Sequence, residues 1–298
     1  MADHQGIRWR TFLEVGIISA AIYFLLGAPG LPAGIISEVS TQGEVPLAKA
    51  KVESLVYPQS NLQCSKHKYD VHVFSTAPLI IYIDGFLSEE ETEHLVRISQ
   101  DKWQVSTVVN EGVETTDETV RKSEKALVER DETVQCIEQR ALDIQGWPQE
   151  TFIERLWTQR YNETGHYAHH YDWATASRTS RRVSTFMVYV SAECVGGGTN
   201  FPRIQAPQSQ QWCEFIECGE TSGQGVTFKP RKGAAVFWTN FDQDGRGYKE
   251  TIHAGMPVTS GTKIGLNIWS WYQAGHRIDA GIKRNQAAAF SDYRAEAS

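Results

Sequence analysis

Two histidines and one aspartate in this chain have residue types and spacing suited to metal binding. His170 and Asp172 flank a single tyrosine in HHYDW, and residues two apart on a β-strand project from the same face. A lone His-x-Asp pair is common, and a strand histidine is more often a hydrogen-bonded core residue. We expect His253, in ETIHAG, to be the third ligand, because two histidines and one carboxylate leave open positions on iron(II).

Nearby histidines compete for the same role. His166 and His169 precede His170, but only His170 has an aspartate two residues later. Alternation along a strand predicts that His169 points to the opposite face. We therefore expect His170, and not its neighbours, to be the ligand.

Lys263 follows His253 by ten residues and offers a cation beside the same site. Most lysines are exposed, and a buried lysine needs an anionic partner. Alternation in KIGLNIWSW divides this segment into two faces. The mixed face carries Lys263, Asn267 and Trp269, and the apolar face carries Ile264, Leu266 and Ile268. This pattern favours an inward Lys263 that binds a carboxylate.

A longer ordered set of residues surrounds these four: Tyr161, Gly165, Tyr167, His170, Asp172, Gly197, Gly198, Thr199, Pro202, His253, Gly255, Pro257, Val258, Gly261, Lys263 and Trp269. With the stretches PLIIYIDGFLSEEETEHLV and TVRKSEKALV, this set resembles the prolyl 4-hydroxylases over residues 78–273. Members of that family are iron(II)- and 2-oxoglutarate-dependent dioxygenases. The resemblance implies a double-stranded β-helix, or jelly-roll, core.

The resemblance also implies a role for each site residue. His170, Asp172 and His253 would bind iron(II) and would be catalytic together with Lys263. Tyr161, Thr199 and Lys263 would bind 2-oxoglutarate, while O2 is the other cosubstrate and ascorbate an expected cofactor. The implied reaction hydroxylates C4 of proline in a peptide or protein and releases succinate and CO2.

Three residues match the family positions that contact the substrate proline: Tyr167, Arg182 and Trp269. Arg178 and Arg181 lie in the same loop and compete with Arg182 for this assignment. The insert 203–225 offers a way to remodel the substrate groove. A related dioxygenase acting on a small molecule or free amino acid, and an inactive barrel that binds proline-rich segments, are the alternatives.

The elements that must position these residues are mainly β-strands with flanking helices. Seven short β runs separated by Gly and Asn breaks follow Phe152, which predicts a β-sandwich or jelly-roll barrel. Ser88 and Glu91 form a capping box that predicts a helix to about Ser99. An apolar stripe predicts a second helix over 131–144, ending at Gly146.

Composition limits the class of protein and its compartment. The 298-residue chain has a net charge of -7, which argues against a nucleic-acid partner. Five cysteines leave at least one unpaired, and Cys213 and Cys218 are close enough to close a small disulfide loop in an oxidising compartment. Thr164 completes a glycosylation sequon at Asn162, where we expect low occupancy because a glycan would crowd the site.

Residues 1–37 contain an apolar stretch after Arg8 and Arg10, shorter than a comfortable membrane span. A signal anchor and a cleaved signal peptide are both compatible with it. The basic flank predicts a cytosolic N-terminus and a lumenal catalytic domain. The resemblance to the prolyl 4-hydroxylases implies a type II anchor in the endoplasmic reticulum membrane. We expect a stem over 38–77 with a short strand at 69–74, the dioxygenase domain over 78–273, and a C-terminal tail over 274–298.

Overall fold

The computed structural model describes residues 51, 54–56, 62–110, 113–146, 148, 150–207, 209–219 and 224–276. These residues belong to one compact unit. The apolar segment predicted within 1–37 and most of the predicted tail lie outside the described residues. Within the described ranges, every helix is too short or too polar to cross a membrane.

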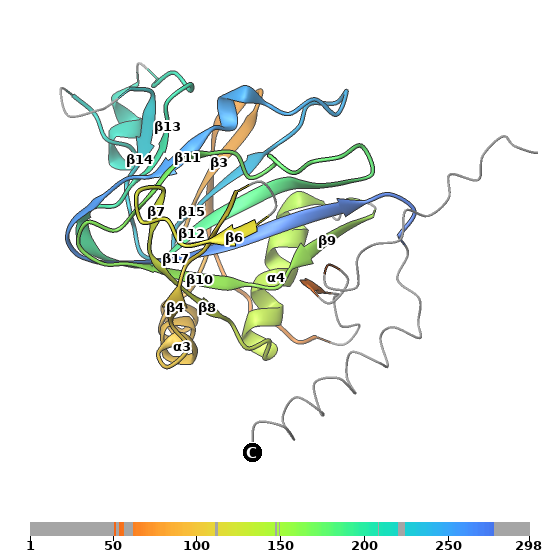
Figure 1. The fold of residues 1–298 in the computed structure, drawn as a ribbon, viewed down its shortest axis with the longest axis horizontal. Coiled ribbons are helices and arrows are strands. Elements are labelled where there is room, and N and C mark those ends of the chain that lie inside the picture. Colours follow the sequence, from red (N-terminus) through yellow and green to blue (C-terminus); the bar gives the residue numbers. More distant parts are fainter. Residues whose placement is uncertain are drawn as a thin grey trace, which may run out of the picture. The chain divides into compact units, whose positions relative to one another are not determined.

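Two antiparallel sheets form the body of the domain (Figure 1). The larger sheet has the strand order β2-β3-β15-β12-β17-β10-β8-β4, and β9 extends it from β17 with β1 outside β9. Its strands are β1 (Leu55–Val56), β2 (Asp70–Thr76), β3 (Leu79–Asp84), β4 (Gln104–Val105), β8 (Glu124–Leu127), β9 (Thr151–Glu154), β10 (Trp157–Tyr161), β12 (Ser180–Gly196), β15 (Ala235–Thr239) and β17 (Val258–Gln273). The predicted mainly β fold is confirmed.

The smaller sheet has the order β14-β13-β16-β11-β7. Its strands are β7 (Arg121–Lys122), β11 (His166–His170), β13 (Thr199–Phe201), β14 (Val226–Phe228) and β16 (His253–Gly255). A separate hairpin joins β5 (Val108–Asn110) to β6 (Val113–Thr115), and the 3-10 helices are η1 (Gln210–Glu214) and η2 (Lys249–Thr251). Both predicted histidine ligands therefore belong to the smaller sheet.

Two α-helices are present among the described residues, as predicted. In α3 (Glu89–Ser99), Ser88 and Glu91 form the expected capping box. In α4 (Glu132–Gln145), the Asp131 side chain accepts from the Val134 backbone N–H, and Gly146 ends the helix at φ 72°. Figure 1 shows α3 below the long strands of the larger sheet, whereas α4 crosses β17 in this view. Each boundary follows from local capping chemistry.

The core is divided between the two faces of the larger sheet. On one face, Leu95 of α3 and Ile137 of α4 pack with Phe186, Leu266 and Ile268. On the other face, a second cluster joins side chains of both sheets, including Tyr189, Phe201, Val226, Phe228 and Trp238. Ile264, Leu266 and Ile268 lie on the helix side, as alternation predicted, so Lys263 and Trp269 face the side of the smaller sheet.

Two disulfides are present. Cys213–Cys218 is the bridge that the close spacing allowed, whereas Cys64–Cys136, which joins residues 72 positions apart, was not expected. Cys194 is free. Disulfides persist in oxidising compartments, so both bonds indicate the secretory pathway.

Parts of the predicted stem and insert are ordered within this unit. The strand predicted at 69–74 is β2, which pairs with β3 in the larger sheet. In the insert, Trp212 packs edge-on against Phe74 of β2, and Phe215 lies 4.8 Å from the ring of His72. These residues of the insert therefore cover the outer strands β2 and β3.

Candidate metal centre and active site

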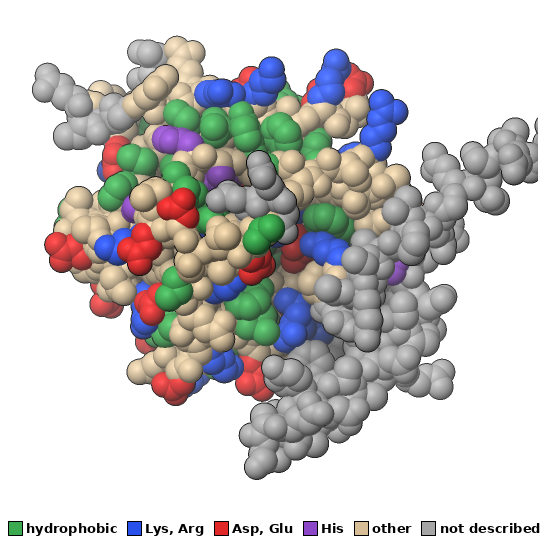
Figure 2. Space-filling view, viewed as in Figure 1, with side chains coloured by type: hydrophobic (Ala, Val, Ile, Leu, Met, Phe, Trp, Pro, Cys, Tyr) green, Lys and Arg blue, Asp and Glu red, His purple; other side chains and the backbone are tan. Residues whose placement is uncertain are grey.

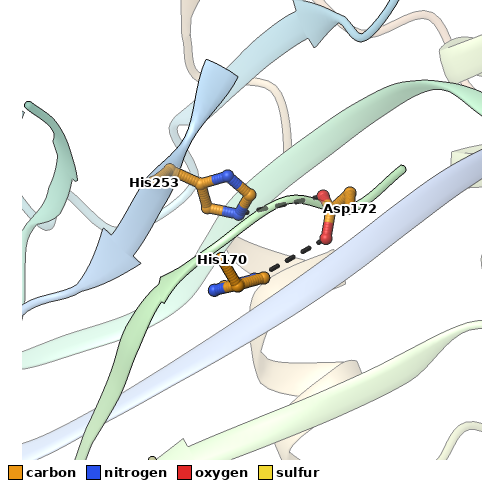
Figure 3. Close-up of side chains that lie close together, drawn as sticks. All are labelled: His170, Asp172 and His253. Atoms are coloured by element: carbon orange, nitrogen blue, oxygen red, sulfur yellow. Dashed lines mark ion pairs between the residues drawn. The ribbon is translucent and has the colours of Figure 1, made fainter. Parts of the chain in front are cut away.

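Pairing of two strands in the smaller sheet brings the three predicted metal ligands together. His170 ends β11, Asp172 follows it, and His253 begins β16. The register places His170 directly opposite His253. Figure 3 shows the two imidazoles and the carboxylate turned toward one another from these neighbouring segments.

The distances fit a single small ion. Nε2 of His170 lies 3.7 Å from Oδ1 of Asp172, and Nε2 of His253 lies 3.8 Å from Oδ2. One ligand atom from each of the three residues lies within 4.8 Å of the others. Asp172 and His253 are buried, while His170 is partly exposed. A metal here would be held from one side and would stay open on the other.

Backbone carbonyls set the orientation of both imidazoles. Nδ1 of His170 lies 2.8 Å from the Ala168 carbonyl oxygen, and Nδ1 of His253 lies 2.9 Å from that of Thr251. A neutral imidazole that donates from Nδ1 keeps its lone pair on Nε2, the atom that faces Asp172. Burial and the neighbouring His170 lower the pKa of His253 to about 4, so it is a neutral ligand at pH 7.

Asp172 is ionised although it is buried. Burial alone would raise its pKa, but His253, His170 and Arg182 hold that pKa well below its usual range. The Thr185 hydroxyl on β12 donates to Oδ2 over 2.7 Å and fixes the rotation of the carboxylate. The chemistry of this donor set, two imidazoles and one carboxylate, fits iron(II).

Lys263 of β17 is buried with 1% of its surface exposed. Its Nζ donates to the Gly197 carbonyl oxygen over 2.6 Å and lies 4.5 Å from the centre of the Tyr161 ring. Within the described ranges it forms no ion pair with a carboxylate. Burial lowers the pKa of Lys263 to about 8, although Cys194 nearby raises it. A buried cation without a carboxylate is costly unless a ligand supplies one.

Tyr161 and Thr199 border the same space. Tyr161 on β10 is paired with Lys263 on β17, and Thr199 on β13 lies opposite Gly255. The Thr199 hydroxyl accepts from Tyr189 over 2.8 Å. Both residues are buried, at 6% and 2% exposure.

Glycines keep this space open. Gly197 adopts φ +72°, and a Cβ there would lie 3.4 Å from Cδ of Lys263. At Gly198 a Cβ would lie 2.8 Å from the Phe228 carbonyl oxygen, closer than side chains tolerate. Both glycines belong to the ordered set of residues noted in the sequence, and close packing requires them at these positions.

Arg182 and Trp269 contact each other, as their shared assignment requires. The guanidinium of Arg182 lies 3.8 Å from the centre of the Trp269 ring. It also donates to Glu154, from Nε to Oε1 over 2.6 Å and from Nη2 to Oε2 over 3.2 Å. Arg181 instead lies against the rings of Phe241 and Tyr272. Of these two arginines, Arg182 is the one whose charge lowers the pKa of Asp172.

Tyr167 lies directly over a metal ligand. Its ring stacks on that of His170 with centroids 3.7 Å apart, and Arg121 lies over its other face at 4.6 Å. His169 lies outside the metal cluster, and its Nε2 lies 3.0 Å from Oδ1 of Asn200. Tyr167 is thus placed to border any substrate that approaches the metal.

Several residues that support the site were not found by sequence reasoning. Thr185 orients Asp172, Glu154 binds Arg182, Arg121 covers Tyr167 and Tyr189 binds Thr199. A buried acid in the otherwise apolar strand TFIE is a signal for Glu154, because isolated buried carboxylates are rare. The other three carry no local signal, since their partners are distant in the sequence.

Comparison with known proteins assigns the family. Residues 156–271 match the 2OG-Fe(II) oxygenase superfamily. Prolyl 4-hydroxylase 1 of Arabidopsis thaliana is 32% identical over 206 residues, which cover 66% of this chain and 70% of the relative. Prolyl 4-hydroxylase 5 of the same plant is 31% identical over 208 residues, 67% of this chain and 70% of the relative. This chain belongs to the prolyl 4-hydroxylase family.

A solved structure of a viral collagen prolyl hydroxylase from Paramecium Bursaria Chlorella virus-1 aligns with a TM-score of 0.49 at 27% identity, over 65% of this chain and 96% of the other. The family match and the cluster of His170, Asp172 and His253 together identify an iron(II)- and 2-oxoglutarate-dependent oxygenase.

Proposed function

We propose that this protein hydroxylates C4 of proline residues in a peptide or protein substrate. The observation that carries the proposal is the pairing of the His170, Asp172 and His253 cluster with a buried lysine that has no carboxylate among its described neighbours. Iron(II) bound to such a cluster supplies oxidative chemistry that consumes O2 and 2-oxoglutarate and yields succinate and CO2. The named prolyl 4-hydroxylases among its relatives support proline as the target.

Within this proposal, Lys263 binds the carboxylate of 2-oxoglutarate that is remote from the metal. The Nζ atom is buried and held between Gly197 and the Tyr161 ring, so its direction is fixed before the ligand arrives. Tyr161 and Thr199 contribute hydroxyls to the same pocket. The neutral imidazoles and the ionised Asp172 bind iron, and ascorbate serves as the accompanying reductant.

Tyr167, Arg182 and Trp269 bind the substrate in this proposal. Tyr167 and Trp269 offer aromatic faces to a proline ring, and Arg182 offers N–H groups to a peptide carbonyl. A hollow lined by charged side chains, including Arg121, Lys122 and Arg160, adjoins this region and suits an extended polar chain. Acidic and basic side chains are interspersed on the face shown in Figure 2.

Coupled turnover tests the proposal. Purified protein with iron(II), 2-oxoglutarate and a proline-rich peptide should release succinate and add one oxygen atom to proline C4, detected by mass spectrometry and by amino-acid analysis. The variant His170→Ala is the blank, and His166→Ala is its matched control on the same strand. Succinate release without peptide oxidation would contradict the peptide substrate and favour a small molecule. Bound iron without any turnover would favour an inactive peptide-binding barrel.

We also propose a lumenal location in the endoplasmic reticulum, with the chain anchored by residues 1–37 as a type II membrane protein. The two disulfides and the basic flank of the apolar segment support it. The proposed domain ranges are a stem over 38–77, the dioxygenase domain over 78–273 and a tail over 274–298. Protease protection of the catalytic domain in sealed microsomes, with a carbonate-resistant membrane pool, is the expected result; full extraction by carbonate would contradict the anchor.

A further inference from the structure

A lysine that precedes the first strand reaches the substrate side of the site. Nζ of Lys51 donates to Oε2 of Glu154 over 2.7 Å and lies 3.6 Å from the centre of the Trp271 ring. Glu154 is 7% exposed and is the same carboxylate that binds Arg182. Two cations from segments 131 residues apart, at positions 51 and 182, therefore share one buried acid.

The main chain that carries Lys51 is docked, so this contact has a structural basis. In β1, Leu55 pairs with Glu154 and Val56 with Ile153, and the Arg155 N–H donates to the Ser54 carbonyl oxygen over 2.7 Å. Leu55 is 1% exposed and packs in a small cluster with Phe152 and Trp271. The short dark-orange strand beside β9 in Figure 1 is this segment.

Charge balance explains what Lys51 does for Arg182. Burial alone would raise the pKa of Glu154, but Arg182 and Lys51 keep it lowered and the carboxylate ionised. If Glu154 faced Arg182 alone, the acid would offset the full charge of that guanidinium. Because Lys51 shares the acid, part of the positive charge of Arg182 remains for a ligand. Arg182 uses Nε and Nη2 for Glu154, and Nη1 bonds to no other residue in the part of the chain that the structure describes.

We infer that Lys51 is a positioning residue for the peptide substrate. It acts through Glu154, which orients Arg182 beside Trp269 and, because Lys51 shares it, offsets only part of the charge of Arg182. This inference rests on the proposed peptide hydroxylase function. It assigns the segment just before β1 to the substrate site. This part of the predicted stem would then contribute to substrate binding as well as link the N-terminal segment to the dioxygenase domain. The ligand group served is a backbone carbonyl of the peptide, which accepts from the free N–H groups of Arg182.

Three variants of the full chain test the inference. Lys51→Met keeps the length of the side chain but removes the charge, Lys51→Arg keeps the charge, and Lys66→Met removes an exposed lysine as the control. We expect Lys51→Met to raise the KM for a proline-rich peptide about fivefold, while kcat and the KM for 2-oxoglutarate change by less than about twofold. Lys51→Arg and Lys66→Met should retain the wild-type values.

A binding measurement separates positioning from a purely structural role. The same peptide, labelled with fluorescein, is titrated with iron-free protein and followed by anisotropy, and its affinity should fall about fivefold in Lys51→Met alone. Wild-type peptide KM and affinity in Lys51→Met would overturn the inference, as would equal losses in Lys51→Arg. A wild-type protein that oxidises no peptide would overturn the proposed function as well. If Lys51→Met is poorly folded, Lys51→Gln is judged by the same criteria.

Discussion

Lys51, which is partly exposed, and Lys263, which is buried, differ in their anionic partner. Lys51 has Glu154 at 2.7 Å, whereas Lys263, more deeply buried, bonds to a backbone carbonyl and an aromatic ring. The first pair is complete within the chain and stabilises the fold. The second cation is held ready for a carboxylate that the described residues do not supply. On the proposed function, the contrast separates a lysine that acts through an acid of the chain from a lysine whose carboxylate partner is the cosubstrate.

The lowered pKa of Lys263 reflects the free-energy cost of burying its charge without a carboxylate partner. A value of about 8, against the ordinary 10.5, means that its charged form is destabilised by roughly 3 kcal/mol in the ligand-free fold. Binding of a carboxylate offsets that cost. On the proposed function, the buried charge of Lys263 lowers the stability of the ligand-free fold and raises the affinity for 2-oxoglutarate.

The largest effect is expected from removing the acid of the complete pair. Glu154→Gln leaves Lys51 and Arg182 without their shared carboxylate, and we expect the free energy of unfolding to fall by about 3–5 kcal/mol. Urea denaturation followed by tryptophan fluorescence measures the change. Glu193→Gln, at an exposed position on β12, is the control and should shift the value by less than about 0.5 kcal/mol. Equal free energies of unfolding in the two variants would contradict the view that Glu154 stabilises the fold as the partner of Lys51.

Lys263→Met, unlike Glu154→Gln, should change ligand affinity and not lower stability. We expect the affinity for 2-oxoglutarate to fall about 100-fold, since a carboxylate loses its buried charged partner. The free energy of unfolding of the ligand-free protein should not fall, because the variant removes a buried charge without a carboxylate. Calorimetric titration and urea denaturation measure the two quantities. A large loss of stability with normal affinity would show that Lys263 is structural.

The smallest of these effects is a pH dependence. Below about pH 8 Lys263 is protonated in the ligand-free protein, and above it each pH unit should weaken 2-oxoglutarate binding by up to about tenfold. The stability contribution has the reverse sign, because the cost of the buried charge is present below pH 8 and disappears as pH rises toward 10.5. Lys263→Arg, which stays charged, serves as the matched variant. Affinity that is flat to pH 9.5 in the wild type would contradict the assignment.

Sequence reasoning predicted the parts of this molecule that depend on local pattern. The capping box at Ser88 predicted the start of α3, and the apolar stripe ending at Gly146 predicted α4. Alternation in β17 correctly separated Lys263 from Leu266 and its apolar neighbours. The His-x-Asp spacing with His253 predicted the cluster that the two strands assemble. In each case the signal lies within a few residues or in a motif whose spacing is characteristic.

Contacts between distant segments escaped prediction. Lys51 and Glu154 are 103 residues apart, and the Cys64–Cys136 disulfide joins positions 72 apart. Nothing in either local sequence identifies its partner, because the pairing depends on how β1 and α4 pack in the finished fold. The insert gave a similar result, since its aromatic residues pack on β2 in a way that only the sheet order explains.

The central claim is that the triad and Lys263 form one site for iron(II) and 2-oxoglutarate. Anaerobic calorimetry with iron(II), followed by 2-oxoglutarate, tests it most directly, with Asp172→Asn, Lys263→Met and His166→Ala compared with the wild type. We predict one iron per chain in the wild type, lost in Asp172→Asn, and in Lys263→Met normal iron binding with weakened 2-oxoglutarate binding. Undiminished binding of both ligands in Asp172→Asn and Lys263→Met would contradict the account.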